Sequence, residues 1–469
     1  MRKVIFLFTF LISVYGFGQA PEMPEKQVLT YQSFLDLVKE HHPIAKQANI
    51  QRDKGDAEVR TARGGFDPKV NSEIQQKYFD GKQYYDISNS NLKVPTWFGI
   101  ELESGFEQNQ GVFLNPENTV PNAGLWYAAV KVPIGQGMFI DQRRAELRKA
   151  QIYQESTEAE QIAILNDLLY GAGKSYWNWF TAYNQLKVYE EAYQLAKQRF
   201  DAVQQSAELG DAPSIDTLES GIQVQNRMLN LQQAKLDFRN ETALLSVFLW
   251  QEGIIPLEVK DGTHPLLRSQ LQPIPVDQNI RLNLDTLVNN HPDLRKYQFK
   301  INSLEIDKRF SREMLKPELN LKYNPLSEPI NNDPFAEYSV NNYKWGLEFT
   351  FPIFLRKERG KLNLVNLKLQ ETELDYDFKR QSLINKAEVA LNTWQTTINQ
   401  VSLCEQTTQD YLGLLSGERR LFNGGESSLF MVNSRELGYI NAQIKLIKLI
   451  AKNRKAQLRA LYSIGVLPL

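Results

Sequence analysis

The chain contains 469 residues, of which 42% are hydrophobic, and its 54 basic and 55 acidic side chains leave a net charge of −1. The mean hydropathy of −0.43 excludes a polytopic helical membrane protein. The balanced charge argues against a nucleic-acid-binding protein, because such a protein carries a basic footprint.

The first 18 residues have the pattern of a secretory signal peptide. Arg2 and Lys3 precede an apolar run over residues 4–14, and small residues stand at the −3 and −1 positions of a cleavage site before Gln19. This run is shorter than the roughly 20 apolar residues of a spanning helix, so a membrane anchor is the less favoured interpretation. We expect residues 1–18 to be removed on export.

The remaining sequence contains an internal repeat. A His-Pro pair at residues 42–43 recurs at 291–292, and each pair is followed 25 residues later by another proline, since 68 − 43 = 25 and 317 − 292 = 25. An alternating segment in each copy then ends in similar triplets, Val-Pro-Ile at 132–134 and Phe-Pro-Ile at 351–353. The repeat predicts two copies of one unit, a helix, strands and long helices, around a pseudo-symmetry axis.

The alternating segments resemble membrane strands. Trp345, Leu347 and Phe349 share one face of their segment, and the segment around 125–133 repeats this pattern at an offset of 219, since 345 − 126 = 219. Alternating strands of about 9–11 residues with aromatic ends are typical of transmembrane β-barrels, although a soluble sheet packed on helices gives the same alternation. The signal peptide and the long wet helices favour the membrane. The predicted lipid-facing positions are Trp126, Val130, Trp345, Leu347 and Phe349.

The first copy contains an additional predicted hairpin at residues 84–107. Apolar and polar residues alternate between Phe98 and Phe106, and a weaker strand precedes them. The hairpin either widens a barrel or folds over its mouth as a lid, whereas the second copy has only a loop rich in Pro and Asn at 324–342. Four strands cannot close a membrane barrel, which needs about eight, so we expect the chain to oligomerise.

Long helices follow the strands. Residues 141–207 contain no proline, and the apolar residues from Ile162 to Leu186 are spaced 3,4,3,4,3,4,3, which is a heptad seam. A helix of roughly 65 residues is about 100 Å long, too long for one globular domain. The second copy repeats this pattern at 358–422. A dimeric coiled coil is the alternative, which the strands and the repeat make less favoured.

A break containing glycine separates the two helices of each copy. Aligning Gly210 with Gly424, an offset of 214, places Phe430 where the first copy has Asp216. The same alignment matches Ser214 with Ser428 and Ile215 with Leu429. The candidate residues of the two tips are Gly210, Asp216, Gly424, Glu426 and Phe430.

The predicted boundaries divide the chain into four parts. A proline-rich linker at 251–280, with short strands such as Leu257–Val259, joins the copies. The signal peptide covers residues 1–18. The first repeat covers 19–250, with strands within 66–134 and helices at 141–207 and 214–250. The second repeat covers 281–469, with strands at 318–323 and 343–352 and helices at 358–422 and 428–464.

Taken in this order, these features resemble the TolC-like outer-membrane efflux family. The resemblance covers about residues 29–467, including Arg143-Arg144 at the start of the long helix, and its motifs are individually weak but specific in their order. It implies a homotrimer whose chains together build one outer-membrane β-barrel, continued into the periplasm by an α-helical barrel. The expected fold is mostly α with β, with long helical hairpins and transmembrane strands.

The resemblance also implies a function. The chain would be a passive conduit, the exit duct of a tripartite efflux pump or of a type I secretion system, in the outer membrane of a Gram-negative envelope. The implied partners are a periplasmic adaptor, an inner-membrane transporter and outer-membrane lipid. The alternative is a periplasmic or surface coiled-coil protein without channel activity.

The tips depart from the family's pattern. Family members often hold the periplasmic end shut with acidic rings and charged links. Asp216 matches an acidic member of such a link, but Phe430 stands where another acidic residue would be expected and Glu426 where a basic one would be. Asp216 and Glu426 would repel each other. We therefore expect closure through apolar residues such as Phe430, or through a different charge pair.

No pattern indicates catalysis, a cofactor or a metal site. The four histidines lack a second ligand at metal spacing, and His42 and His291 precede prolines as helix-entry residues. The Gly-Gln-Gly segment at 135–137 lacks the third glycine of a nucleotide loop. The single cysteine, Cys404, is interpreted as a packing residue. We therefore expect a protein that is not an enzyme.

Overall fold

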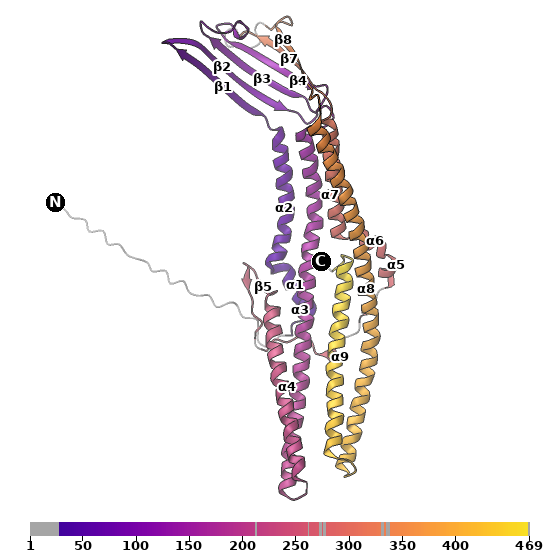
Figure 1. Ribbon diagram of the computed structural model, residues 1–469. Helices are drawn as coiled ribbons and strands as arrows, with labels where there is room; N and C mark the ends of the chain where they lie inside the picture. Colours follow the sequence, from indigo (N-terminus) through magenta and orange to yellow (C-terminus); the bar gives the residue numbers. More distant parts are fainter. Residues whose placement is uncertain are drawn as a thin grey trace, which may run out of the picture.

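The computed structural model describes residues 28–467, apart from positions 212, 261, 272–273, 275–277, 330–332 and 334–337. The predicted signal peptide therefore lies outside the described residues, as do several residues of the linker. The chain is elongated, with a β-sheet at one end of a long helical rod (Figure 1). At the other end, two tight turns each connect a long helix to the shorter helix that follows it.

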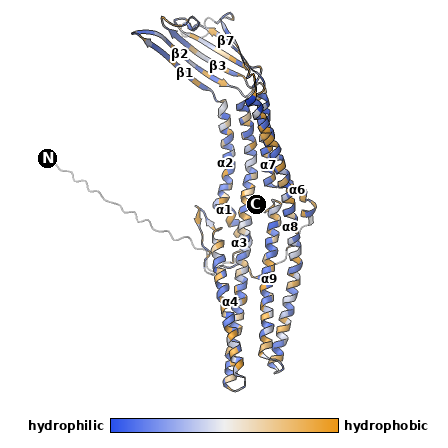
Figure 2. Ribbon diagram, in the orientation of Figure 1, coloured by the Kyte–Doolittle hydropathy of each residue, from blue (hydrophilic) through white to orange (hydrophobic). Residues whose placement is uncertain are grey.

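Two uninterrupted helices run along the rod. α3 (Gln142–Glu208) has 67 residues and α8 (Arg356–Asn423) has 68, so each is about 100 Å long at 1.5 Å per residue. The Asp141 carboxylate caps α3 by accepting a hydrogen bond from the Arg144 N–H at 2.8 Å. Apolar and polar residues intermix along both helices (Figure 2), as expected for helices with a packed face and a wet face.

Shorter helices pack in sequence along these two. Their bounds are α1 (Tyr31–His41), α2 (Pro43–Arg63), α4 (Ser214–Ser246), α7 (Pro292–Glu313) and α9 (Leu429–Ser463). α2 and α4 both pack on α3, and α7 and α9 both pack on α8. The lateral order is therefore α2–α3–α7–α8 near the sheet and α4–α3–α9–α8 near the tips. This order leaves α2 and α4 on one long side of the chain and α8 on the other.

The sheet is antiparallel, in the order β1-β2-β3-β4-β7-β8. Its strands are β1 (Lys69–Phe79), β2 (Lys82–Pro95), β3 (Glu101–Gln110), β4 (Leu125–Pro133), β7 (Glu318–Ser327) and β8 (Tyr343–Thr350). The pairing of β4 with β7 joins the two repeats. β2 and β3 occupy the predicted hairpin and lie within the sheet, not across it as a lid. The edge strands are β1 and β8.

The main hydrophobic core lies at mid-length, where α1, α3, α4 and α9 meet. Trp179 is fully buried there, and its indole N–H donates to the Thr242 hydroxyl at 2.9 Å. The Tyr176 hydroxyl donates to the Leu29 carbonyl at 2.9 Å. These hydrogen bonds give the polar groups of the two aromatic side chains a partner, so that their rings can be buried in the core without an unsatisfied donor.

The linker differs from the prediction. A two-stranded ribbon of β5 (Trp250–Gln251) and β6 (Ile255–Pro256) replaces the strand predicted at Leu257–Val259. The ribbon forms earlier because Gly253 and Ile254 both have positive φ, +86° and +63°, which reverses the chain at once. Two short helices, α5 (Gln278–Leu282) and α6 (Leu284–Asn289), then lead to α7.

Candidate functional site

One face of the sheet carries aligned apolar side chains. The pairing register places Leu102 opposite Val130, Val130 opposite Tyr323, and Tyr323 opposite Trp345, so one apolar row crosses four strands. All five positions predicted to face lipid are exposed in the chain, from 38% for Val130 to 65% for Phe349. An exposed apolar face of this extent marks a membrane or protein contact in a folded protein.

The opposite face of the sheet is polar and internally paired. Lys322 on β7 forms an ion pair with Glu103 on β3 at 3.2 Å, across the boundary between the repeats. The Tyr127 hydroxyl donates toward Asn89 and Glu103 at 3.1 and 3.2 Å. Gly105 makes room for this ring, because an added Cβ would lie 2.6 Å from the tyrosine oxygen. A sheet with one apolar and one polar face has the chemistry of a barrel wall between lipid and water.

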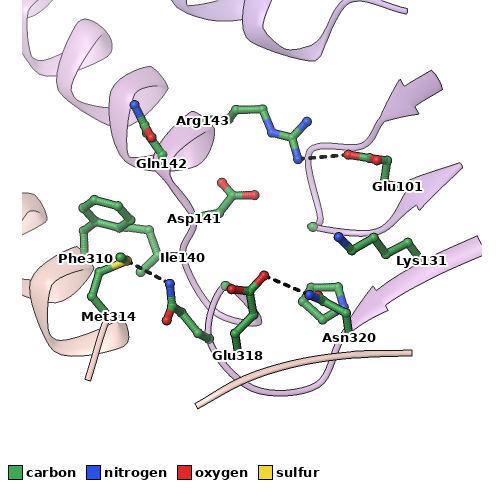
Figure 3. A pocket seen from close by; sticks show the side chains of 14 residues that line it. Glu101, Lys131, Ile140, Asp141, Gln142, Arg143, Phe310, Met314, Glu318 and Asn320 are labelled. Carbon is green, nitrogen blue, oxygen red and sulfur yellow. Dashed lines mark hydrogen bonds and ion pairs between the residues drawn. The ribbon is translucent and has the colours of Figure 1, made fainter. Parts of the chain in front are cut away.

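A cavity of about 300 Å³ lies where the sheet joins the helices (Figure 3). Glu101 from β3 and Arg143 from α3 face each other across it at 3.6 Å, and Lys131 and Glu318 also line it. The lining therefore carries both charge signs. We interpret it as part of the joint between sheet and rod, not as a binding site.

Arg144 organises the turn from β4 into α3. The residue is 9% exposed, and its guanidinium donates to the carbonyl oxygens of Gly137, Met138 and Phe139, the latter two at 3.2 and 3.3 Å. A planar guanidinium with several donors suits this role, because three carbonyl groups would otherwise lack partners. The sequence identified Arg143-Arg144 as the start of the helix but not this function.

At the far end of the rod, the two tips correspond with an offset one residue larger than predicted. Gly210 has a φ of +84°, and the residue with a matching backbone in the second tip is Gly425 at +76°, whereas Gly424 has −82°. The return helices begin at residues 214 and 429, an offset of 215. The predicted alignment at 214 is therefore corrected by one residue, because Gly425 and not Gly424 supplies the left-handed position.

The corrected alignment changes which residues of the two tips stand at equivalent positions. Phe430 corresponds to Ile215, and both side chains are exposed, at 65% and 70%. Asp216 is half-buried in the first turn of α4, and Glu426 is exposed in the second tip. Within the described residues, neither carboxylate forms an ion pair. The two tips thus present equivalent apolar side chains.

A buried polar network lies above the tips and joins all four helices there. We name it the tip cluster. Arg199 on α3 contacts the Glu436 carboxylate and donates to the Asn433 side chain at 2.7 Å. Arg419 on α8 reaches the same carboxylate at 3.3 Å, and Asn433 donates to Glu219 on α4 at 2.9 Å. The Glu436 side chain is only 3% exposed. The tip cluster is therefore a charged contact between the α3–α4 and α8–α9 hairpins.

Arg227 on α4 extends the tip cluster. The residue is 4% exposed, and burial lowers the pKa of its guanidinium, with nearby Arg199 acting in the same direction and Glu436 opposing. Glu436 thus contacts two guanidinium groups and acts electrostatically on a third. The sequence contains a signal for this site that we did not use: Asn433 and Glu436 stand at spacings 4 and 7 from Leu429 on the buried stripe of α9, where apolar residues are expected.

His42 and His291 cap helices in the two repeats. The Nδ1 atom of each accepts a hydrogen bond from the backbone N–H two residues later, Ile44 or Asp293, at 3.1 Å. Burial lowers the pKa of both imidazoles, and for His291 the charge of Asp293 opposes this effect. Both side chains therefore act as neutral acceptors, in keeping with their interpretation as helix-entry residues.

These caps predict a pH-dependent stability. In the unfolded chain these two histidines take up protons near pH 6.5, whereas in the folded chain they resist protonation. The stabilisation that the neutral caps contribute is therefore fully present above pH 6.5 and is lost as pH falls through the lowered pKa of the folded histidines. The loss is at most about 1.4 kcal/mol per pH unit for each proton taken up. Melting temperatures between pH 7.5 and 5 measure it. His42→Asn, which keeps a cap but does not titrate, should flatten the profile, whereas His41→Asn should not.

The described residues contain no helix long and apolar enough to cross a membrane. They also contain no group of three or more His, Cys, Asp or Glu side chains placed to hold a metal ion. The arrangement described above consists instead of a two-faced sheet, a long rod and a charged contact at the tips.

Comparisons with known proteins give a family for the second repeat and a fold for the chain. Residues 283–464 match the family described as outer membrane efflux protein, and no curated protein sequence matches. The CmeC outer membrane channel of Campylobacter jejuni is 15% identical, with a TM-score of 0.66 over 93% of this chain and 85% of that one. The open-state MtrE outer membrane channel of Neisseria gonorrhoeae is 12% identical, with a TM-score of 0.67 over 93% and 88%.

A third solved structure has the same fold. The outer membrane protein VceC of Vibrio cholerae is 12% identical, with a TM-score of 0.64 over 93% of this chain and 96% of that one. The likeness thus spans nearly the whole chain, including the first repeat that the family match does not reach. These findings confirm the resemblance and the mixed α and β fold class that the sequence predicts.

Proposed function

We propose that this chain, whose second repeat matches outer membrane efflux proteins, forms the exit duct of an efflux pump in the outer membrane. In this function the sheet is a segment of a barrel wall, and the helices extend it into the periplasm as a tube. The apolar and polar faces of the sheet support the assignment, since lipid covers one face of a barrel wall and water the other.

The observation that carries the proposal is that both long sides of the chain are open. β1, α2 and α4 form one side, and β8 and α8 form the other. Both sides carry apolar residues that no other described part of the chain covers. They are Ile215, Leu218, Ile222, Leu229 and Leu236 on α4, and Leu367, Leu374, Phe378, Val389 and Leu403 on α8. Unpaired strand edges and exposed apolar stripes of this length require partners.

A ring of identical chains supplies these partners. When one side of a molecule fits the other side of its copy, the contact is heterologous, and a closed ring follows if the rotation closes. Three copies of a six-stranded sheet give 18 strands, and barrels of 16–18 strands enclose an aqueous channel. We therefore propose a homotrimer, which is the assembly that the resemblance to TolC-like proteins implies.

The proposed partners are a periplasmic adaptor and an inner-membrane transporter. A duct of this kind is passive, so an energy-coupled component elsewhere must drive transport through it. The tips lie farthest from the sheet (Figure 1), where a periplasmic partner has access to them. A pump and a type I secretion system both fit this arrangement.

Negative-stain imaging of protein extracted from membranes with detergent tests the function. Rods well over 100 Å long with threefold end views are expected. Compact or monomeric particles, or protein recovered without detergent, would instead favour the alternative of a periplasmic or surface coiled-coil protein.

Phe430→Asp tests whether apolar side chains close the periplasmic end. Phe430 and Ile215 are exposed at equivalent places of the two tips, and apolar constrictions block ions by excluding water. We expect Phe430→Asp to raise the resting conductance in planar bilayers at least roughly twofold. Leu209→Asp, at another exposed apolar position near the first tip, is the matched control. An unchanged resting conductance would remove Phe430 from the closure.

A further inference from the structure

Basic residues gather where four helix ends meet the sheet. The segments 60–69, 141–149, 308–316 and 356–361 contain 15 basic and five acidic residues, a net charge of +10, in a chain whose net charge is −1. They are the ends of α2 and α7 and the starts of α3 and α8 that adjoin the sheet. Figure 2 shows the upper ends of α7 and α8 in blue. The four segments are therefore far more basic than the rest of the chain.

Exposed apolar side chains lie in the same region. Ile134 and Ile353 continue the alternation of β4 and β8 past the strand ends and are 48% and 84% exposed. Phe139 and Phe354 precede the long helices and are 66% and 70% exposed. Together with the basic residues 316, 356, 357, 359 and 361, these four side chains define what we call the junction belt.

Aromatic and basic side chains are paired in both repeats. The Lys316 ammonium lies 4.5 Å from the centre of the Phe139 ring, and the Arg356 guanidinium lies 5.1 Å from that of Phe354. A cation on an aromatic ring is stabilised modestly. The Lys316 ammonium also forms an ion pair with Glu313 at 2.7 Å, whereas Arg356 is exposed and forms no ion pair within the described residues. Such cation–aromatic pairs suit the boundary between hydrocarbon and water, where aromatic rings and basic groups meet the lipid headgroups.

Three basic side chains at the start of α8 have no ion-pair partner within the described residues. Lys357, Arg359 and Lys361 are exposed and form no ion pair there. Their position is also unfavourable for the helix, because the N-terminal end of its dipole repels cations. An external anion would pair with these cations and would also offset their repulsion by the helix dipole. Charge complementarity therefore selects an anionic occupant for the junction belt.

We propose that the junction belt binds the headgroups of anionic phospholipids in the periplasmic leaflet. The proposal rests on the proposed function, which places the apolar face of the sheet in the outer membrane and the belt at its lower edge. The apolar side chains then reach the acyl region, and the basic side chains contact the phosphates. Basic groups next to a membrane gain from each such contact, and the gain falls with salt.

The test uses full-length protein purified in neutral detergent. Phosphatidylglycerol or phosphatidylcholine is added, and the melting temperature and the bound lipid in native mass spectra are measured. Phosphatidylglycerol is expected to stabilise the protein more, and high salt should remove the difference. In the variant Lys357→Gln/Arg359→Gln/Lys361→Gln, the apparent affinity for phosphatidylglycerol should fall at least roughly tenfold. Equal effects of the two lipids, or an unchanged affinity in the variant, would overturn the proposal.

The matched control changes three exposed lysines of α9, as Lys445→Gln/Lys448→Gln/Lys452→Gln. It removes the same charge far from the sheet and should keep the lipid preference. The oligomeric state without lipid is measured for all proteins. Loss of oligomer in the belt variant alone would assign the belt to a second copy of the chain and overturn the lipid assignment. A wild-type protein that is monomeric and needs no detergent would overturn the proposed function itself, so the two failures are distinguishable.

Discussion

Glu436→Gln should loosen the contact between the two helical hairpins at the tips and destabilise the protein by about 3–5 kcal/mol. The Glu436 carboxylate is nearly inaccessible and lies among Arg199, Arg419 and Arg227. Removing its charge leaves the guanidinium groups of Arg199 and Arg227, which are largely buried, without a counter-charge, and this costs far more than an exposed ion pair contributes. Because these residues come from separate hairpins, the tips should also separate more easily. Melting temperature and resting conductance measure the two effects.

Two further variants make this result interpretable. Glu426→Gln removes a carboxylate at the same end of the rod that forms no ion pair within the described residues, so it should change neither quantity. The triple variant Arg199→Leu/Arg227→Leu/Glu436→Leu replaces the buried charges by apolar groups and should recover most of the stability, as replacing buried ion pairs or triads often does. If Glu436→Gln behaves like Glu426→Gln, the tip cluster contributes no measurable stability.

Phe349→Arg should prevent assembly in the outer membrane. Phe349 lies on the apolar face of β8, opposite Leu319 on β7, and is 65% exposed. An arginine on the lipid side of a barrel costs about 2–4 kcal/mol near the middle of the bilayer, and the proposed trimer carries the change three times. The fraction of heat-resistant oligomer recovered from outer membranes measures the loss.

The neighbouring residue supplies the control. Glu348 precedes Phe349 on the same strand, and alternation directs its side chain to the polar face. Glu348→Arg introduces the same arginine and should assemble nearly normally. Equal losses in the two variants would point to a general folding defect, and normal assembly of Phe349→Arg would contradict the conduit function.

The sequence predicted local features well because local patterns determine them. The alternation of Trp345, Leu347 and Phe349 depends only on the period of a strand, and the length of α3 only on a heptad seam without proline. Contacts between distant residues were not predictable in this way. Lys322 and Glu103 are 219 positions apart, and Arg199 and Glu436 are 237 apart. Each pair exists only because the fold brings distant parts of the chain together: β3 and β7 flank β4, and α3 packs against α9.

The tip alignment failed for a different reason. The second tip contains two successive glycines, Gly424 and Gly425, and either one can adopt a positive φ. Only the structure determines that Gly425 does so. The error of one residue changed the interpretation of how the periplasmic end closes, because it aligned Phe430 with Asp216 instead of with Ile215.

The two open sides of the chain have a genetic consequence. In the proposed head-to-tail ring of three, each molecule touches both neighbours, so one subunit with a damaged side breaks a contact in every ring that it joins. If equal amounts of normal and damaged chains mix at random, only about one eighth of the rings contain three normal subunits. A missense allele that alters β1 or β8 but leaves the subunit folded should therefore be dominant over the wild type, whereas a deletion of the gene should be recessive.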